Sequence, residues 1–426
     1  MKRRIEVKYL TRVEGEGALT LETQGGEVTN ARLEIFEPPR FFEALLVGRD
    51  YRQAPDITSR ICGICPVAYQ ITASQAMEHA LGLSVAPEIQ LLKRLVYCGE
   101  WIESHILHIF LLHLPDFLGL DDSLQLAKKN PQAVQTALNI KKLGNELVTL
   151  VGGREIHPIN LRVGGFYQAP SCQALRALLP RFQQALQDLR GLLPLLAGLD
   201  FPTFTQDYLF VALRPTEGYP LEQGRVVTST GLDLGKEDYE TRFQETQVPG
   251  SNALHSHLEG EPYLVGPMAR FALNFDRLTP ACQQIARDLG LGPGPERNPF
   301  KSILVRAVES YYALEEAARL IEAYQPPNLS PLEASPQAGT GFGLTEAPRG
   351  MLYHRYTLDP AGAILQAKIV PPTSQNLPRI EADLKAFAQP RLDLDDQQLT
   401  WMLEQAIRNY DPCISCATHF LKLRRL

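Results

Sequence analysis

Two Cys-x-x-Cys pairs at opposite ends of the chain constrain its fold more than any other feature. Cys62 and Cys65 lie in Arg60-Ile-Cys-Gly-Ile-Cys-Pro66, and Cys413 and Cys416 lie in Asp411-Pro-Cys-Ile-Ser-Cys-Ala-Thr-His419. Two intervening residues let both thiolates of a pair converge on one ion from a turn or a helix start. Each pair alone could be a redox couple or half of a zinc site. Together they offer four sulfur ligands to one soft metal, drawn from both ends of the chain.

The composition is that of a globular protein. Hydrophobic residues make up 44% and charged residues 21% of 426 residues, enough for a large core. The net charge of -6 gives no basic footprint, so we expect no nucleic-acid partner. With neither a secretory signal nor an apolar stretch of transmembrane length, the expected location is the cytoplasm. Seven cysteines, an odd number, favour reduced thiols over a disulfide framework.

The expected fold class is α+β, with a large central helical bundle, an N-terminal antiparallel β meander and smaller β-rich excursions. We expect one merged domain over 1–426: the meander in 1–38, a helical core with the first cysteine pair in 39–200, a β-rich excursion in 201–265, and a helical and irregular part with the second pair in 266–419. Hydrophobic periodicity predicts a hairpin from 351–356 and 364–369. It predicts helices over 68–81, 88–114, 172–197, 276–289, 299–324 and 395–408.

Spacing alone makes a closed four-cysteine zinc site the leading interpretation, because thiolate tetrads most often bind structural zinc. The long separation between the pairs weakens it. Structural zinc usually staples a short segment that has no core of its own, whereas these pairs flank a chain that can build one. A metal held from both ends of a large domain is more typical of a catalytic centre. Cys98, Cys172 and Cys282 are interpreted as small buried hydrophobes.

The sequences around the cysteines resemble the two signatures of the nickel-iron hydrogenase large subunit. Further segments look like elements of that family in family order: Thr11-Arg-Val-Glu-Gly15, Arg40-Phe-Phe-Glu43, 157–165, Glu346-Ala-Pro-Arg-Gly350 and Val370-Pro-Pro-Thr373. The resemblance implies a cytoplasmic enzyme that oxidises or produces hydrogen reversibly. It also implies that Cys62 and Cys413 are terminal nickel ligands. Cys65 and Cys416 would bridge nickel to an iron that carries carbon monoxide and cyanide.

The same resemblance assigns proton-handling residues. Arg349 matches the arginine that hangs over the metals, and its proline and glycine neighbours could form a turn that aims it. Glu14 matches the carboxylate that relays protons from a terminal cysteine. Asp411 and Asp116 match acids that surround the arginine and would fix its position. Thr373 is a candidate donor to a cyanide, since Pro372 stands where many relatives have serine.

A second, redox-inert metal ion, magnesium or iron, is also implied. Its ligands would be Glu43, His419 and the backbone carbonyl near Lys368. Tyr69 stands where many relatives carry a histidine that bonds a bridging sulfur. These departures resemble the cytoplasmic, multimeric, nicotinamide-linked branch. Three helix histidines, His105, His108 and His113, are expected to be hydrogen-bonded interior residues, with His113 off the face that the other two share.

Electrons must leave through partners, because no cysteines in a cluster-binding pattern are left over. The expected partners are an iron-sulfur small subunit, together with further NAD(P) or flavin electron-transfer subunits, since no Gly-x-Gly-x-x-Gly turn occurs where it would be needed. Nickel-insertion factors and a maturation endopeptidase are also implied, the latter removing 420–426 after His419. Two alternatives stay open: a non-catalytic zinc protein, and a relative of the quinone-site subunit of respiratory NADH dehydrogenase.

Overall fold

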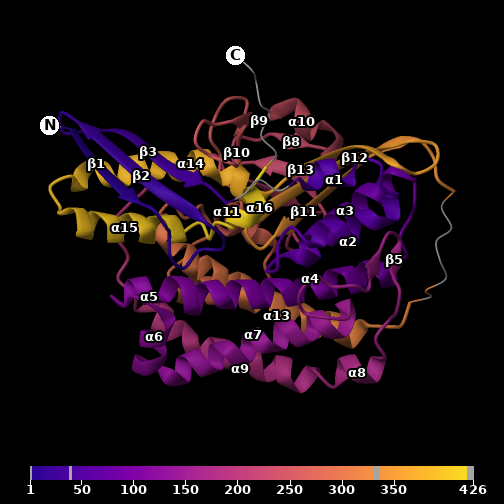
Figure 1. The fold of residues 1–426 in the computed structure, drawn as a ribbon. Helices are drawn as coiled ribbons and strands as arrows, with labels where there is room; N and C mark the ends of the chain where they lie inside the picture. Colours follow the sequence, from indigo (N-terminus) through magenta and orange to yellow (C-terminus); the bar gives the residue numbers. More distant parts are fainter. Residues whose placement is uncertain (1, 38–40, 328, 330–334, 420–426) are drawn as a thin grey trace, which may run out of the picture.

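Long helices form one layer of the molecule, and small sheets with further helices lie over it (Figure 1). The computed structural model describes residues 2–37, 41–327, 329 and 335–419. The helical layer consists of α4 (Pro87–Leu107), α7 (Pro131–Gly152), α9 (Leu179–Ala197) and α13 (Ser302–Ala323). This layer confirms the predicted helical centre. The expected tail, 420–426, lies outside the described residues.

Helices α4 and α7 approach each other closely because each has a glycine at the crossing. A Cβ on Gly99 of α4 would lie 3.1 Å from the backbone oxygen of Gly144, and a Cβ on Gly144 of α7 would lie 2.8 Å from that of Gly99. Side chains at either position would therefore push the helices apart. Helix α7 begins with Pro131 at its first turn and ends at Gly152, and the next residue, Gly153, caps it with a left-handed φ of 86°.

The N-terminal meander consists of β1 (Lys2–Val7), β2 (Gly17–Gln24) and β3 (Glu27–Ile35), paired antiparallel in that order. Alternate residues of β3 are buried, which gives the sheet one inner face. That sheet packs on α14 (Pro372–Ala388) and meets α15 (Asp396–Arg408) through the bond from Arg3 Nε to Asp396. The N-terminus thus lies beside the segment that leads to the second cysteine pair.

A second antiparallel sheet holds β11 (Gly339–Ala347), β12 (Gly350–Leu358) and β13 (Ile364–Val370). Strand β11 runs directly against α3 (Pro66–Ala80), the helix that follows the first cysteine pair. Contact is so close that a Cβ on Gly343 would lie 2.1 Å from the backbone oxygen of Thr72. Glycine in β11 therefore sets the distance between this sheet and α3.

The predicted β-rich excursions are small sheets. One contains β6 (Val211–Arg214), β7 (Arg225–Thr228) and β8 (Asp233–Leu234), and another pairs β9 (Phe243–Gln247) with β10 (Leu254–Leu258). They share a separate hydrophobic cluster with β11, β12 and β13, around Tyr239, Phe243 and Tyr353. The remaining elements are short: α1 (Phe42–Leu46), α2 (Ala54–Ser59), α5 (Leu114–Phe117), α6 (Ser123–Lys129), β4 (Leu161–Arg162), β5 (Gly165–Phe166), α8 (Cys172–Arg176), α10 (Tyr239–Arg242), α11 (Pro267–Asn274), α12 (Pro280–Asp288) and α16 (Ile414–Ala417).

The structure differs from the predicted elements in four places. Strand β11 and helix α14 were not predicted, because glycines in one and prolines in the other are typical of irregular chain. The helix expected over 172–197 breaks after Arg176 into α8 and α9. The helix expected over 88–114 changes to π geometry at His108–His113. No helix in the described part of the chain is long and apolar enough to cross a membrane.

Candidate metal centre

The two cysteine pairs meet in the interior of the molecule. All four Sγ atoms lie within 4.8 Å of one another, and all four residues are buried. Sγ of Cys62 lies 3.4 Å from Sγ of Cys413, and Sγ of Cys65 lies 3.5 Å from Sγ of Cys416. Among the described residues, no other group of three or more His, Cys, Asp or Glu could hold a metal ion. The predicted convergence of four sulfurs on one centre is therefore present.

The first pair is positioned by the start of α3. Cys65 is the N-cap of α3, and Pro66 occupies its first turn. The Cys65 side chain makes no capping hydrogen bond to α3. Glu100 of α4 caps the helix instead, since its carboxylate accepts hydrogen bonds from the backbone N–H groups of Val67 (2.6 Å) and Ala68 (3.1 Å). Sequence reasoning missed Glu100, which looks like an ordinary helix residue. It anchors the first pair to the helical layer.

The second pair sits on a short turn that three parts of the chain hold in place. Cys413 is the N-cap of α16, and Asp411 just before it has a φ of 50° in the left-handed region. The Cys413 N–H donates to Oγ1 of Thr373 (3.0 Å), and the Ile414 N–H donates to the backbone oxygen of Glu14 (2.9 Å). Ser302 Oγ donates to the carbonyl of Asn409 (2.7 Å). The second cysteine segment is thus fixed by the N-terminal loop, α14 and α13.

Glu14 lies against Cys413, the first cysteine of the second pair. Its Oε2 accepts from Cys413 Sγ (3.2 Å) and from the backbone N–H of Ser415 (3.0 Å). Burial, and next the negative charge of Cys62, raise the pKa of Glu14, although the bonds from Ser415 and Cys413 act in the opposite direction. Glu37, which sequence reasoning missed, accepts from Oγ of Ser415 (2.9 Å) and extends this network. A carboxylate in this position can exchange a proton with a thiol.

Arg349 is buried in the turn between β11 and β12 and is held by Asp411. Its Nε donates to the Asp411 carbonyl (2.8 Å) and its Nη2 donates to Oδ1 of Asp411 (3.0 Å). Burial lowers the pKa of Arg349, but the charges of Asp411, Cys413, Cys65 and Cys62 outweigh it and raise that pKa well above its ordinary value. The guanidinium therefore stays charged beside the thiolates, which suits charge stabilisation better than proton acceptance.

Asp116 does not bond Arg349, contrary to the expectation that it helps to fix that arginine. Its Oδ2 accepts from Nε of Arg408 (2.7 Å), and its Oδ1 accepts from Nη2 of Arg12 (2.5 Å). Arg408 also donates to the backbone oxygen of Thr11 (2.9 Å). The Asp116 carboxylate pairs with the guanidinium groups of Arg12 and Arg408, so it links the N-terminal loop to the end of α15.

Two buried hydrogen-bond donors beside the cysteines have no partner in the described part of the chain, namely the Tyr69 hydroxyl and Nη1 of Arg349. Burial, followed by the negative charge of Cys416 and Cys65, raises the pKa of Tyr69 well above its ordinary value. Buried donors are normally satisfied. Two orphaned donors beside four soft ligands fit a bound metal centre whose own ligands accept hydrogen bonds.

The thiol chemistry also fits a metal. Hydrogen bonds from Cys413, Cys416 and Cys65 lower the pKa of Cys62 well below its ordinary value, and the charge of Arg349 acts in the same direction. One thiolate among three thiols can bind a soft metal ion, and metal binding then displaces the protons of the other three thiols. The residues present thus fit a nickel-iron centre held by four cysteines.

Glu43 and His419 meet at the exit of the second cysteine segment. His419 Nε2 lies 2.9 Å from Oε2 of Glu43, and Oε1 of Glu43 accepts from the Ile369 N–H (2.7 Å). Burial raises the pKa of Glu43, but the bond and charge of His419 outweigh it and leave that pKa lowered. Lys368 lies in β13 beside Ile369, and its ammonium group pairs with Glu245. The structure thus places Glu43 beside His419, and Glu43 also bonds the residue that follows Lys368.

The three helix histidines are buried. His108 Nε2 lies 2.8 Å from the Arg408 carbonyl, and His113 Nε2 lies 3.0 Å from Oδ1 of Asn409. His105 Nε2 lies 3.0 Å from Glu309, outside hydrogen-bond geometry. The expected separation of His113 from His108 is wrong: their ring centroids are 5.0 Å apart, because the π-helical turn stacks residues five apart.

Comparison with known proteins agrees with this geometry. Residues 40–137 and 254–419 match the family described as Nickel-dependent hydrogenase. The chain is 32% identical to the alpha chain of sulfhydrogenase 2 from Pyrococcus furiosus, covering 98% of this chain and 100% of that protein. It is 30% identical to an F420-non-reducing hydrogenase subunit from Methanothermobacter thermautotrophicus, covering 98% and 94%.

Among solved structures, an NAD+-reducing [NiFe]-hydrogenase in the H2-reduced state superposes with a TM-score of 0.87 at 26% identity, covering 98% of this chain and 99% of that one. The fold, the four-cysteine centre and the length of the match agree. The chain therefore belongs to the nickel-dependent hydrogenase family, as a large (alpha) subunit.

Proposed function

We propose that this chain is the catalytic large subunit of a cytoplasmic nickel-iron hydrogenase that oxidises hydrogen reversibly and passes electrons, through an iron-sulfur small subunit, to NAD(P). The observation that carries the proposal is the convergence of four buried Sγ atoms within 4.8 Å in a chain of this family. Zinc is disfavoured by the match over residues 40–137 and 254–419, because the matching family is nickel-dependent.

Cys62 and Cys413 would be terminal nickel ligands, and Cys65 and Cys416 would bridge nickel to iron. When bound, the nickel-iron centre with its carbon monoxide and cyanide ligands supplies the heterolytic cleavage of hydrogen. Tyr69 and Arg349 would donate hydrogen bonds toward this centre from their unpartnered atoms. Thr373 accepts the Cys413 N–H through Oγ1, so its own hydroxyl proton is available for donation to a cyanide.

The proton would move from Cys413 to Glu14, whose carboxylate oxygen lies 3.2 Å from the sulfur. Transfer over this distance needs no rearrangement of the backbone, because the Glu14 and Cys413 segments are bonded side by side. Burial raises the pKa of Glu14, so its carboxylate can hold a proton received from the thiol. Arg349, held by Asp411, would stabilise negative charge on the thiolates.

Electron transfer requires a partner that reaches the cysteines. Of the remaining cysteines, Cys98, Cys172 and Cys282, none joins a metal-binding group within the described residues. Ile156, Ile159 and Tyr167 are each more than half exposed, at 51%, 54% and 58%. Gly63, between the first two cysteines, lies against Ile156. We infer that the small subunit covers this surface, the 156–167 surface, one residue away from the metal ligands.

The electron acceptor is assigned to further subunits. The solved relative is named as NAD+-reducing, whereas the Methanothermobacter relative is named as F420-non-reducing. Only the first of these names states an acceptor. The branch resemblance favours NAD(P) and flavin-containing partners here.

We also propose a second metal ion, magnesium or iron, at Glu43, His419 and the carbonyl of Lys368. The Glu43–His419 pair supports it, since a carboxylate and an imidazole already face each other at 2.9 Å. Nickel-insertion factors would load the centre, and an endopeptidase would then remove 420–426. His419 would become the C-terminus of the active chain.

Hydrogen-dependent reduction of methyl viologen by the purified complex tests this function. The wild-type complex should reduce the dye and contain nickel and iron, and Cys65→Ser should lose both properties. Cys98→Ser is the matched control, because Cys98 is buried outside the centre. Zinc in place of nickel, with no dye reduction, would identify the non-catalytic alternative.

A further inference from the structure

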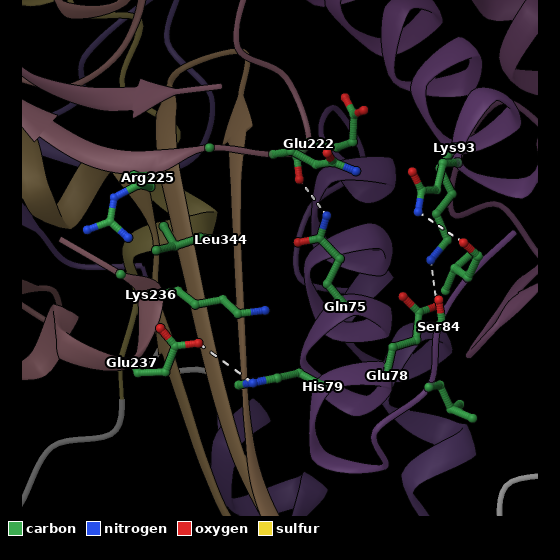
Figure 2. A pocket seen from close by; sticks show the side chains of 16 residues that line it. Gln75, Glu78, His79, Ser84, Lys93, Glu222, Arg225, Lys236, Glu237 and Leu344 are labelled. Carbon is green, nitrogen blue, oxygen red and sulfur yellow. Dashed lines mark hydrogen bonds and ion pairs between the residues drawn. The ribbon is translucent and has the colours of Figure 1, made fainter. Parts of the chain in front are cut away.

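A polar cavity of about 530 Å³ lies between the end of α3, the start of α4 and the segment 222–237 (Figure 2). Its α3 residues, Gln75, Glu78 and His79, follow Cys65 by ten to fourteen positions on the same helix. At 1.5 Å per residue they lie roughly 15–21 Å along that helix from the cysteines. None of the proposed metal or proton-handling residues lines the cavity. Its volume is typical of a small-molecule site, about 300–1,000 Å³.

Two acids of the cavity wall are already neutralised by internal cations. Glu78 pairs with Lys93 at 2.5 Å, with 8% and 5% of their side chains exposed, and also accepts from the Gly164 N–H (2.8 Å). Glu222 pairs with Arg94 at 2.8 Å. Buried pairs of this kind are costly to assemble and fix the wall rigidly. They leave these two carboxylates unavailable to a cation in the cavity.

Lys236 supplies a positive charge that nearby carboxylates offset only in part. Its side chain is half-buried, and it has no hydrogen bond or ion pair within the described residues. Figure 2 shows its amino group extending from the 222–237 segment between Gln75 and His79, into the cavity. Burial lowers its pKa, and the charges of Glu237 and Glu78 only partly oppose this. An anion in the cavity would relieve that cost.

His79 faces the same space with a donor. Its Nδ1 accepts the backbone N–H of Phe342 (3.1 Å), so in the neutral ring Nε2 carries the proton. Nε2 lies 3.6 Å from Oε1 of Glu237, too far for a hydrogen bond. Glu237 is exposed, so solvent reaches its carboxylate. Its carboxylate lies beside Nε2 of His79, so a ligand's acid group in that place would face the donor of the histidine.

We propose that this cavity binds a small organic anion, whose carboxylate or phosphate group pairs with Lys236 Nζ and accepts from Nε2 of His79. The rest of the molecule would lie along the polar wall formed by Gln75 and Ser84. The inference does not depend on the hydrogenase function, because the cavity and the cysteines are separate.

Calorimetric titration of the purified complex with succinate or with inorganic phosphate, each alone, tests the proposal. At least one anion should bind, and the one that binds identifies the acid group. Lys236→Met should weaken binding by about ten-fold or more, the loss expected for one charge-assisted hydrogen bond. Lys236→Arg should keep the affinity, and Lys236→Glu should abolish binding.

The matched control is Lys128→Met, an exposed lysine on α6 far from the cavity, which should bind as the wild type does. Lys236 forms no hydrogen bond or ion pair within the described residues and its burial is costly, so its replacement by methionine should not lower the melting temperature. If neither anion binds, or if Lys236→Met binds as tightly as the wild type, the proposal is wrong. Because titration heat does not require turnover, failure here leaves the hydrogenase proposal untouched.

Discussion

Replacing Glu14 by glutamine tests whether this residue accepts a proton or only holds the structure. The amide has the size of the carboxylate, and its oxygen can still accept from the Ser415 N–H, which lies 3.0 Å away. It cannot take a proton from Cys413 Sγ at 3.2 Å. Glu14→Gln should therefore fold, load nickel and bind the small subunit like the wild type.

The expected loss follows from the chemistry of the missing group. A positioned general acid or base contributes about 10²–10⁴ in rate, equivalent to about 2.7–5.4 kcal/mol of barrier. The turnover number for hydrogen oxidation should fall by that factor. The KM for hydrogen should stay within about two-fold, because the carboxylate contributes to proton transfer and not to hydrogen binding.

The assay is hydrogen-dependent dye reduction, with nickel content measured on the same samples. Glu16→Gln is the matched control, since Glu16 is an exposed glutamate in the same loop. It should keep wild-type turnover. A Glu14→Gln enzyme with half of the wild-type turnover would refute the relay, and loss of nickel from that variant would assign Glu14 a structural role instead.

Three further changes have defined outcomes. Gly343→Ala should lower the free energy of unfolding by about 1–3 kcal/mol in urea titration, because its Cβ would lie 2.1 Å from a backbone oxygen of α3. Gly292→Ala is the control and should leave that free energy unchanged, because a Cβ on Gly292 meets nothing within 4 Å. Burial raises the pKa of Glu103 from 4.5 to about 8. Its contribution to the free energy of unfolding is therefore fully present below pH 4.5 and is lost as pH rises through 8, at about 1.4 kcal/mol per pH unit and at most about 5 kcal/mol in total. Glu103→Gln should remove this part of the pH dependence in urea titrations. Glu43→Gln should lose the second metal, but not nickel, in elemental analysis, because the carboxylate paired with His419 is gone.

The central helices and the convergence of the cysteines could be predicted from the sequence because their signals are local. Apolar periodicity and proline boundaries identify α4 and α13, and paired thiols at fixed spacing define a soft metal site whatever lies between them. Flanking residues such as Arg349 and Glu14 carried the prediction of nickel and iron, by resemblance. The structure places both beside the cysteines.

Other features depend on distant packing and could not be predicted. Prolines 371, 372 and 378 suggest an interrupted segment, yet α14 starts at Pro372, where a missing N–H costs nothing, and continues through Pro378 against β3 and β10. The π turn at His108–His113 changes which side chains face each other. Asp116 bonds Arg12 and Arg408, two partners that no sequence spacing brings together.

The identity of the centre is the central claim, and infrared spectroscopy of the purified complex combined with elemental analysis tests it most directly. We expect bands of metal-bound carbon monoxide and cyanide, with one nickel and one iron per chain at the four cysteines, and loss of the bands in Cys65→Ser. A protein that contains zinc at these cysteines and shows no such bands would contradict the account.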